Sequence, residues 1–168
     1  MAENQNGAIQ GDPNAPQAGV IAQYVKDLSF ENPNAPQSFQ IPEGEKPNIE
    51  VNINVNGNKI GDDTFEVELK ITASSEVGGK KAFVVELVYA GLFALKNMPE
   101  EAMQPFMLVQ APVMLFPFAR RVIADATRDG GYSPLLLDPI DFAGLFQQQV
   151  AKQAQEAPTG DAAPTASE

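Results

Sequence analysis

Cysteine, histidine and tryptophan are all absent from this chain of 168 residues. Without cysteine, the chain forms no disulfide framework, no thiolate nucleophile and no cysteine-based zinc or iron–sulfur site. Without histidine, it lacks the commonest metal ligand and the usual general base near neutral pH. These absences exclude Ser–His–Asp and Cys–His catalytic sites built from this chain alone, and we expect no metal site and no cofactor.

Positive charge is also scarce, because 11 Lys and Arg residues stand against 22 Asp and Glu residues. Nucleic acids and anionic membranes attract cationic surfaces, so this balance argues against both and favours a basic partner. We find no stretch of about 18 apolar residues, as a membrane-spanning helix needs. The first residues also lack the basic and apolar regions of a signal peptide. We therefore expect a cytoplasmic protein without direct membrane insertion.

Both ends of the chain have few or no large apolar side chains. Such segments cannot offset the entropy of ordering by burial. We predict a disordered N-terminal tail over residues 1–19, one folded domain over residues 20–151, and a disordered acidic C-terminal tail over residues 152–168.

The first half of the domain has the two-residue periodicity of antiparallel strands. Apolar and polar residues alternate over residues 51–56 and 65–73, and residues 24–30 form a further predicted strand. Residues 82–93 are apolar on both faces apart from Glu86. Such a strand is either central and covered twice or in contact with another subunit, and we favour the subunit contact.

The second half of the domain is predicted to be helical. Pro117 suits the first position of a helix that ends at Gly130, and Asp138 followed by proline suits the start of a second helix. Three prolines interrupt residues 98–116, where we expect a short helix and a loop. Four strands followed by helices indicate an α+β fold with a four-stranded antiparallel sheet and helices on one side.

Few residue patterns in the chain suggest catalysis. The paired glycines at residues 78–79 and 130–131 lack the spacing and the strand-to-helix context of a phosphate-binding loop. Asp27 and Glu31 share one face of a strand but are roughly 13 Å apart, whereas a retaining glycosidase pair needs roughly 5 Å. A hydrolase that uses Asp27 or Glu86 is the enzymatic alternative, and we expect no enzyme.

The same carboxylates suggest a binding surface. Glu86 shares a face with Val84 on its strand, so a sheet that joins the two strands would place Asp27, Glu31 and Glu86 around an apolar spot at Val84. The simplest interpretation is a solvated sheet face. The functional interpretation is a docking patch, where charge guides a basic partner and apolar contact holds it.

Four segments of the chain carry family motifs in order and in register: residues 26–36, 82–87, 111–120 and 134–146. They resemble the SecB family of bacterial cytosolic export chaperones, and the resemblance runs from about residue 20 to residue 153. It implies a homotetramer, built as a dimer of dimers, with sheets paired across subunits and helices between them. It also implies binding of unfolded precursor proteins without ATP and their delivery to the SecA motor.

The resemblance also implies two sets of site residues. In the family, SecA docks on two acidic positions of the first strand and on an apolar and an acidic position of the last strand; these match Asp27, Glu31, Val84 and Glu86. SecA would contribute a basic C-terminal segment that carries its own zinc. The client groove lies between the sheet, the loop after the first strand, and helices, and we assign to it Phe39, Ile41, Phe65 and Phe116.

An alternative function is an acidic β-sheet adaptor module without affinity for unfolded chains. Composition and periodicity separate this adaptor poorly from a chaperone. Only the family resemblance favours the chaperone.

Overall fold

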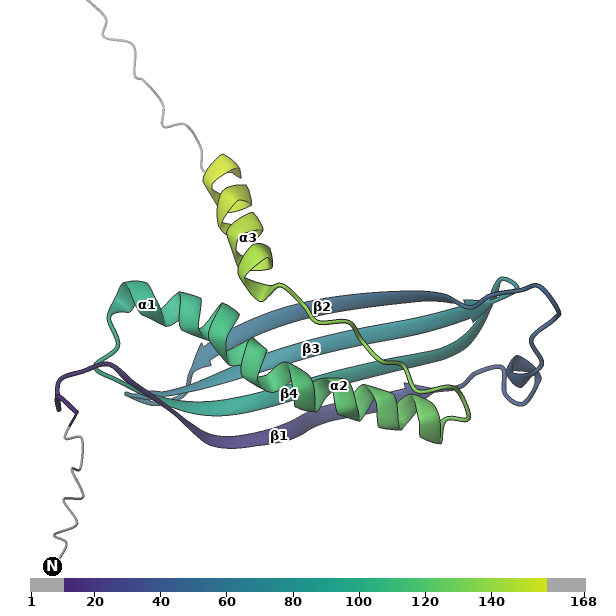
Figure 1. Cartoon of the computed structure of the whole chain (residues 1–168), viewed down its shortest axis with the longest axis horizontal. Coiled ribbons are helices and arrows are strands. Elements are labelled where there is room, and N and C mark those ends of the chain that lie inside the picture. Colours follow the sequence, from purple (N-terminus) through teal and green to yellow (C-terminus); the bar gives the residue numbers. More distant parts are fainter. Residues whose placement is uncertain (1–10, 157–168) are drawn as a thin grey trace, which may run out of the picture.

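The computed structural model describes residues 11–156, and the predictions for residues 1–10 and 157–168 lie outside these described residues. Apart from one short helical turn between the first two strands, the strands come first and the helices follow (Figure 1). The strands are β1 (Gln17–Glu31), β2 (Asn48–Lys59), β3 (Thr64–Val77) and β4 (Lys80–Lys96). The helices are η1 (Gln37–Phe39), α1 (Glu100–Pro105), the π-helical turn η2 (Phe106–Gln110), α2 (Ala111–Asp129) and α3 (Phe142–Glu156).

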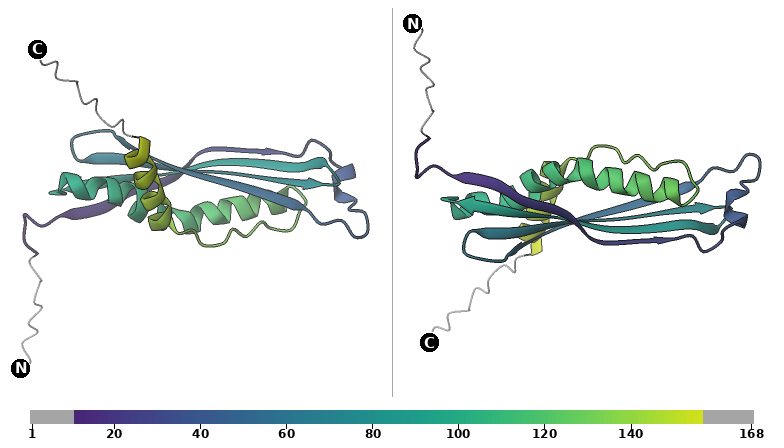
Figure 2. Two further views of the ribbon diagram at one scale, coloured as in Figure 1. Left: turned by 90° about the horizontal axis from the view of Figure 1, so that it is seen from above. Right: turned by 90° about the horizontal axis from the view of Figure 1, so that it is seen from below.

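The four strands form one antiparallel sheet in the order β1-β4-β3-β2. Strand β4 therefore lies between β1 and β3, while β1 and β2 are the edges. Helix α2 lies along one face of the sheet, and the opposite face carries no helix among the described residues (Figure 2). We call the helix-covered face the inner face and the opposite one the outer face. The four-stranded antiparallel sheet with helices on one side was predicted correctly.

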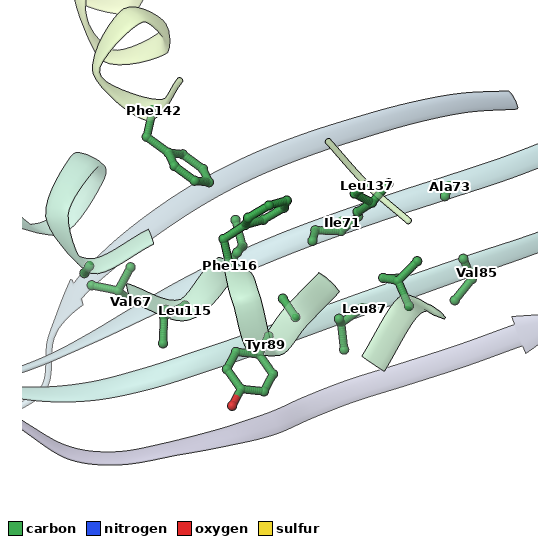
Figure 3. Packing of buried hydrophobic residues seen from close by; sticks show 14 of the residues in the cluster. Val67, Ile71, Ala73, Val85, Leu87, Tyr89, Leu115, Phe116, Leu137 and Phe142 are labelled. Carbon is green, nitrogen blue, oxygen red and sulfur yellow. The ribbon is translucent and has the colours of Figure 1, made fainter. Parts of the chain in front are cut away.

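The hydrophobic core lies between the inner face and α2 (Figure 3). Odd-numbered residues of β3 and β4, such as Ile71 and Leu87, point into it, and Leu115 lies there from α2. Ala119 and Ile123 of α2 are fully buried in the same cluster. Inward-facing residues recur at every second position of the strands and at every fourth position of α2, so the sheet and the helix bury one continuous apolar stripe between them. Fully burying one such Leu or Ile side chain contributes about 1.5–3 kcal/mol.

The folded region extends beyond the boundaries predicted from composition. Residues 17–19 of the predicted N-terminal tail begin β1, because their backbone groups pair with residues 94–96 of β4 and need no apolar side chain to do so. Residues 152–156 of the predicted C-terminal tail are the last turn of α3. Lys, Gln, Ala and Glu propagate a helix well even where they stay exposed.

The proline-rich segment before Pro117 is helical, which corrects the predicted short helix and loop. Helical backbone runs from Glu100 to Asp129, so Pro117 lies inside α2 and not at its first position. A proline inside a helix lacks one N–H and crowds the preceding turn. The wider π-helical turn η2 directly after Pro105 is where the helix departs from regular geometry, and Pro112 lies in the first turn of α2.

This helical run also corrects the expectation that no segment resembles a membrane span. It has 30 residues, and its most apolar window has a mean hydropathy of 1.4, so length and composition alone would allow it to cross a membrane. Its stripe of Leu115, Ala119 and Ile123 is buried against the sheet. This is the arrangement of a core helix in a soluble protein.

The ends of the helices differ from the prediction by a few residues. Asp141, not Asp138, caps α3, because its carboxylate accepts a hydrogen bond of 2.9 Å from the N–H of Gly144. Helix α2 ends at Gly130 as expected, but the left-handed backbone is at Gly131, where φ is 95°. A side chain at Gly131 would also come within 2.8 Å of the Phe39 ring.

Candidate functional site

The structure brings Asp27, Glu31, Val84 and Glu86 together on the outer face, and we call these four residues the acidic face. In the β1–β4 pairing, Ser29 lies opposite Glu86 and Glu31 lies opposite Val84. The three carboxylates are exposed and Val84 is half-buried. Within residues 11–156 none of the three carboxylates forms an ion pair, so their charge is available to a partner in solution.

A polar network lies beside the acidic face on the same side of the sheet. The Tyr24 hydroxyl donates to Glu66 Oε1 at 2.5 Å, and Lys26 Nζ donates to Glu66 Oε2 at 3.0 Å. Lys26 also pairs with Glu68. The bonds from Tyr24 and then Lys26 lower the pKa of Glu66, while Glu68 and Glu66 raise the pKa of Lys26. Both groups are therefore charged near neutral pH.

An apolar groove lies at the other edge of the sheet, between β2 and the extended segment that precedes α3. It is lined mainly by residues from these two elements, and we call it the β2 groove: Ile49, Val51, Ile53, Leu135, Leu136, Leu137 and Ile140. Leu136 is 65% exposed, and Ile49 and Val51 are also exposed. The groove therefore offers several aliphatic side chains to an apolar partner.

The loop between β1 and β2 is tied to the body of the subunit by side-chain hydrogen bonds. Asn34 Nδ2 donates to the backbone oxygen of Lys81 at 2.7 Å, and the Tyr132 hydroxyl donates to Asn32 Oδ1 at 2.6 Å. The Phe39 ring packs against Tyr132, with ring centroids 5.3 Å apart. These contacts hold Phe39 at the end of the sheet where β4 begins.

The four side chains assigned to the client groove do not gather in one place. Phe39 is 46% exposed and Ile41 is similarly exposed in the β1–β2 loop. Phe65 and Phe116 are only 4% and 7% exposed and belong to the core of the subunit. Phe39 packs on Tyr132, which in turn packs on Phe83 of β4. Phe65 lies opposite Phe93, ten residues further along β4. At the usual rise per residue, that separation is about 33 Å.

Sequence reasoning missed most of the β2 groove. The three consecutive leucines at residues 135–137 have no helical or strand period, so periodicity could not assign them to a face. Val51 belongs to the alternating stretch of residues 51–56, for which the pattern predicts one buried face, whereas Ile49 lies just before that stretch. They are exposed because β2 is an edge strand at the margin of α2. The run of three leucines after Pro134 was the one signal in the sequence that could have pointed to this apolar segment.

An acidic sheet face and an apolar groove on one helix-backed sheet are the surfaces of a binding protein. Among residues 11–156, no His, Cys, Asp or Glu cluster is placed to hold a metal ion. The family model "Preprotein translocase subunit SecB" matches residues 11–153. The chain therefore belongs to the SecB family of protein-export chaperones.

Curated relatives support this assignment, and one solved structure shares the fold. The chain is 51% identical to the protein-export protein SecB of Sphingopyxis alaskensis, over 97% of this chain and 94% of that protein. It is 52% identical to that of Rhizorhabdus wittichii, over 90% and 92%. A SecB-like chaperone of Mycobacterium tuberculosis, solved in complex with a ChAD peptide from the HigA1 antitoxin, has a similar fold, with a TM-score of 0.57 and 17% identity. That likeness covers 74% of this chain and 91% of the other.

Proposed function

We propose that this protein is an ATP-independent chaperone that binds unfolded precursor proteins in the cytosol. It keeps them competent for translocation and delivers them to the SecA motor. The observation that carries the proposal is the exposed, aliphatic β2 groove in a chain of the SecB family. Folded proteins bury the apolar stretches that such a groove fits, so the groove favours unfolded clients.

The client site that best fits the structure is the β2 groove together with Phe39 and Ile41 in the β1–β2 loop. These side chains are exposed in the subunit, whereas Phe65 and Phe116 would have to leave the core to touch a client. The Mycobacterium tuberculosis neighbour was solved with a bound peptide, which is consistent with a peptide segment as the ligand here. In an oligomer, a long client would contact several grooves, so modest contacts would add through effective concentration.

The acidic face is proposed to dock SecA. Its three carboxylates, which form no ion pair within residues 11–156, suit the basic C-terminal segment of SecA, and Val84 provides an apolar contact among them. Charge would steer the encounter and apolar contact would hold it. The zinc belongs to that segment of SecA.

The proposed assembly is a homotetramer, built as a dimer of dimers. Apolar side chains on the inner side of β1 and on α2 remain about half exposed in the single subunit: Val25, Leu28, Val113 and Phe118. Strand β1 is also an open edge. A second copy of the chain would cover both features, which isolated subunits would otherwise expose to aggregation.

Refolding kinetics test the proposed chaperone activity. A chemically unfolded, slow-folding precursor should refold several-fold more slowly when this protein is present without nucleotide, because the captured fraction cannot fold while it is bound. The same precursor, folded beforehand, should be unaffected. Refolding at the same rate with and without the protein would contradict the proposal and favour the adaptor module.

A further inference from the structure

The acidic face depends on an irregularity in β1. The register of β1 against β4 shifts between Val25 and Asp27, so Lys26 is an extra residue that the pairing skips. A bulge of this kind bends the strand and re-aims the side chains that follow it. Because of the bulge, Asp27 and Glu31 point to the outer face, while Leu28 points to the inner face, opposite Leu87.

A strand without the bulge would present a different surface. Side chains alternate with a period of two, so removing the extra residue would send every side chain after Val25 to the opposite face. Leu28 would then lie opposite Glu86 in place of Ser29. Asp27 and Glu31 would point toward α2, and the acidic face would lose two of its three carboxylates.

The bulge residue is anchored across the sheet. Lys26 and Tyr24 reach over β4 to Glu66 and Glu68 on β3, through the hydrogen bonds described above. Ala90 of β4 lies between β1 and β3 at this point: it pairs with Tyr24 of β1 on one side and with Glu68 of β3 on the other, and it is fully buried. The small alanine leaves room for the longer side chains to meet above it.

We propose that Tyr24 and Lys26 are positioning residues for the acidic face. By clamping the bulge of β1 to Glu66 and Glu68, they hold Asp27 on the outer face, ready for a basic partner. Glu66 is only 7% exposed, so its charge needs these two donors, and charge-assisted hydrogen bonds are the strong kind. This inference rests on the proposed SecA-docking role of the acidic face.

Binding of the zinc-loaded C-terminal segment of SecA to the full chain, measured by calorimetry, separates positioning from simple charge. Lys26→Met removes a cation, so an effect of charge alone would strengthen binding of a basic segment. Positioning predicts the opposite sign, with binding about tenfold weaker. Lys26→Arg should restore binding, because it keeps a cationic donor.

Lys70→Met is the matched control. Lys70 is exposed on the outer face, opposite Val88, and forms no ion pair within the described part of the chain. This variant loses the same charge on the same face but leaves the bulge intact. Its affinity for the SecA segment should be equal to that of the parent chain or higher.

A disulfide assay reads the register directly, because the chain has no native cysteine. The pair Ser29→Cys and Glu86→Cys should oxidise to a crosslink in the observed register, and the pair Leu28→Cys and Glu86→Cys in the slipped one. Lys26→Met should decrease the first crosslink and increase the second.

These measurements can contradict the inference in two ways. Unchanged or tighter SecA binding by Lys26→Met, with the 29–86 crosslink intact, would show that Lys26 contributes only charge. If the parent chain itself does not bind the SecA segment, the proposed function of the acidic face is wrong. The crosslinks in the parent chain and in Lys26→Met would still decide whether Lys26 holds the register.

Discussion

Reversing one charge on the acidic face should separate SecA docking from client binding. Glu86 is exposed beside Val84 and lies opposite Ser29, between Asp27 and Glu31 on β1. Glu86→Lys removes an attraction for a basic segment and adds a repulsion. Two unit charges at contact distance interact by about 1 kcal/mol in water, so the reversal should cost about 2 kcal/mol, or about 30-fold in affinity.

Calorimetry with the zinc-loaded SecA segment measures this loss, which should shrink at high salt because exposed charges are screened over about 8 Å at physiological ionic strength. Asp62→Lys in the β2–β3 turn is the control. Neighbouring Thr64 pairs with Ala94, eight residues along β4 from Glu86, or about 26 Å. Equal losses of affinity in the two variants, or no loss in Glu86→Lys, would show that the charge of Glu86 does not contribute to docking at this face. Binding of an unfolded precursor should be unchanged in both variants.

Three further predictions follow from burial and charge. Leu136→Asp should weaken binding of an unfolded precursor about tenfold, as measured by fluorescence titration. Its stability in urea should change little because Leu136 is mostly exposed. Unchanged client affinity would show that the β2 groove is not part of the client site. Phe116→Ala should lower the free energy of unfolding, measured by urea denaturation, by about 3–5 kcal/mol because the buried ring packs edge-to-face on Phe142. A loss below about 1 kcal/mol would show that the ring is not part of the core. The hydrogen bond from Tyr24 lowers the pKa of Glu66, so this carboxylate stabilises the fold above its unfolded pKa and loses that contribution as the pH falls through its folded pKa. The stability advantage of the parent chain over Tyr24→Phe should therefore be present at neutral pH and should decrease as the pH falls below about 4.3, the ordinary pKa of Glu. A difference that stays constant as the pH falls would contradict the assignment.

The acidic face could be predicted from sequence because its pattern is local. Residues 27–31 alternate in one phase after the bulge, and residues 84–88 do the same on β4. The bulge itself left a trace, since Val25 and Leu28 are three apart and yet both point inward. A regular strand over residues 24–30, as predicted from the sequence, has no place for that extra residue.

The helical half and the client groove depended on tertiary context. Prolines 105, 112 and 117 indicate breaks by local propensity, but packing of the apolar stripe on the sheet outweighs that preference, and a π-helical turn accommodates the chain. Phe65 and Phe116 are as aromatic as Phe39, so residue type could not separate core from groove. Only the position of each element decides which ring is covered.

The proposed function requires this chain to bind unfolded proteins as an assembled oligomer. Size exclusion with light scattering tests it most directly, with the protein alone and with a chemically unfolded precursor, in the absence of nucleotide. We expect a tetramer that gains the mass of one client and does not bind the folded form. A monomer, or an oligomer that ignores unfolded chains, would contradict it.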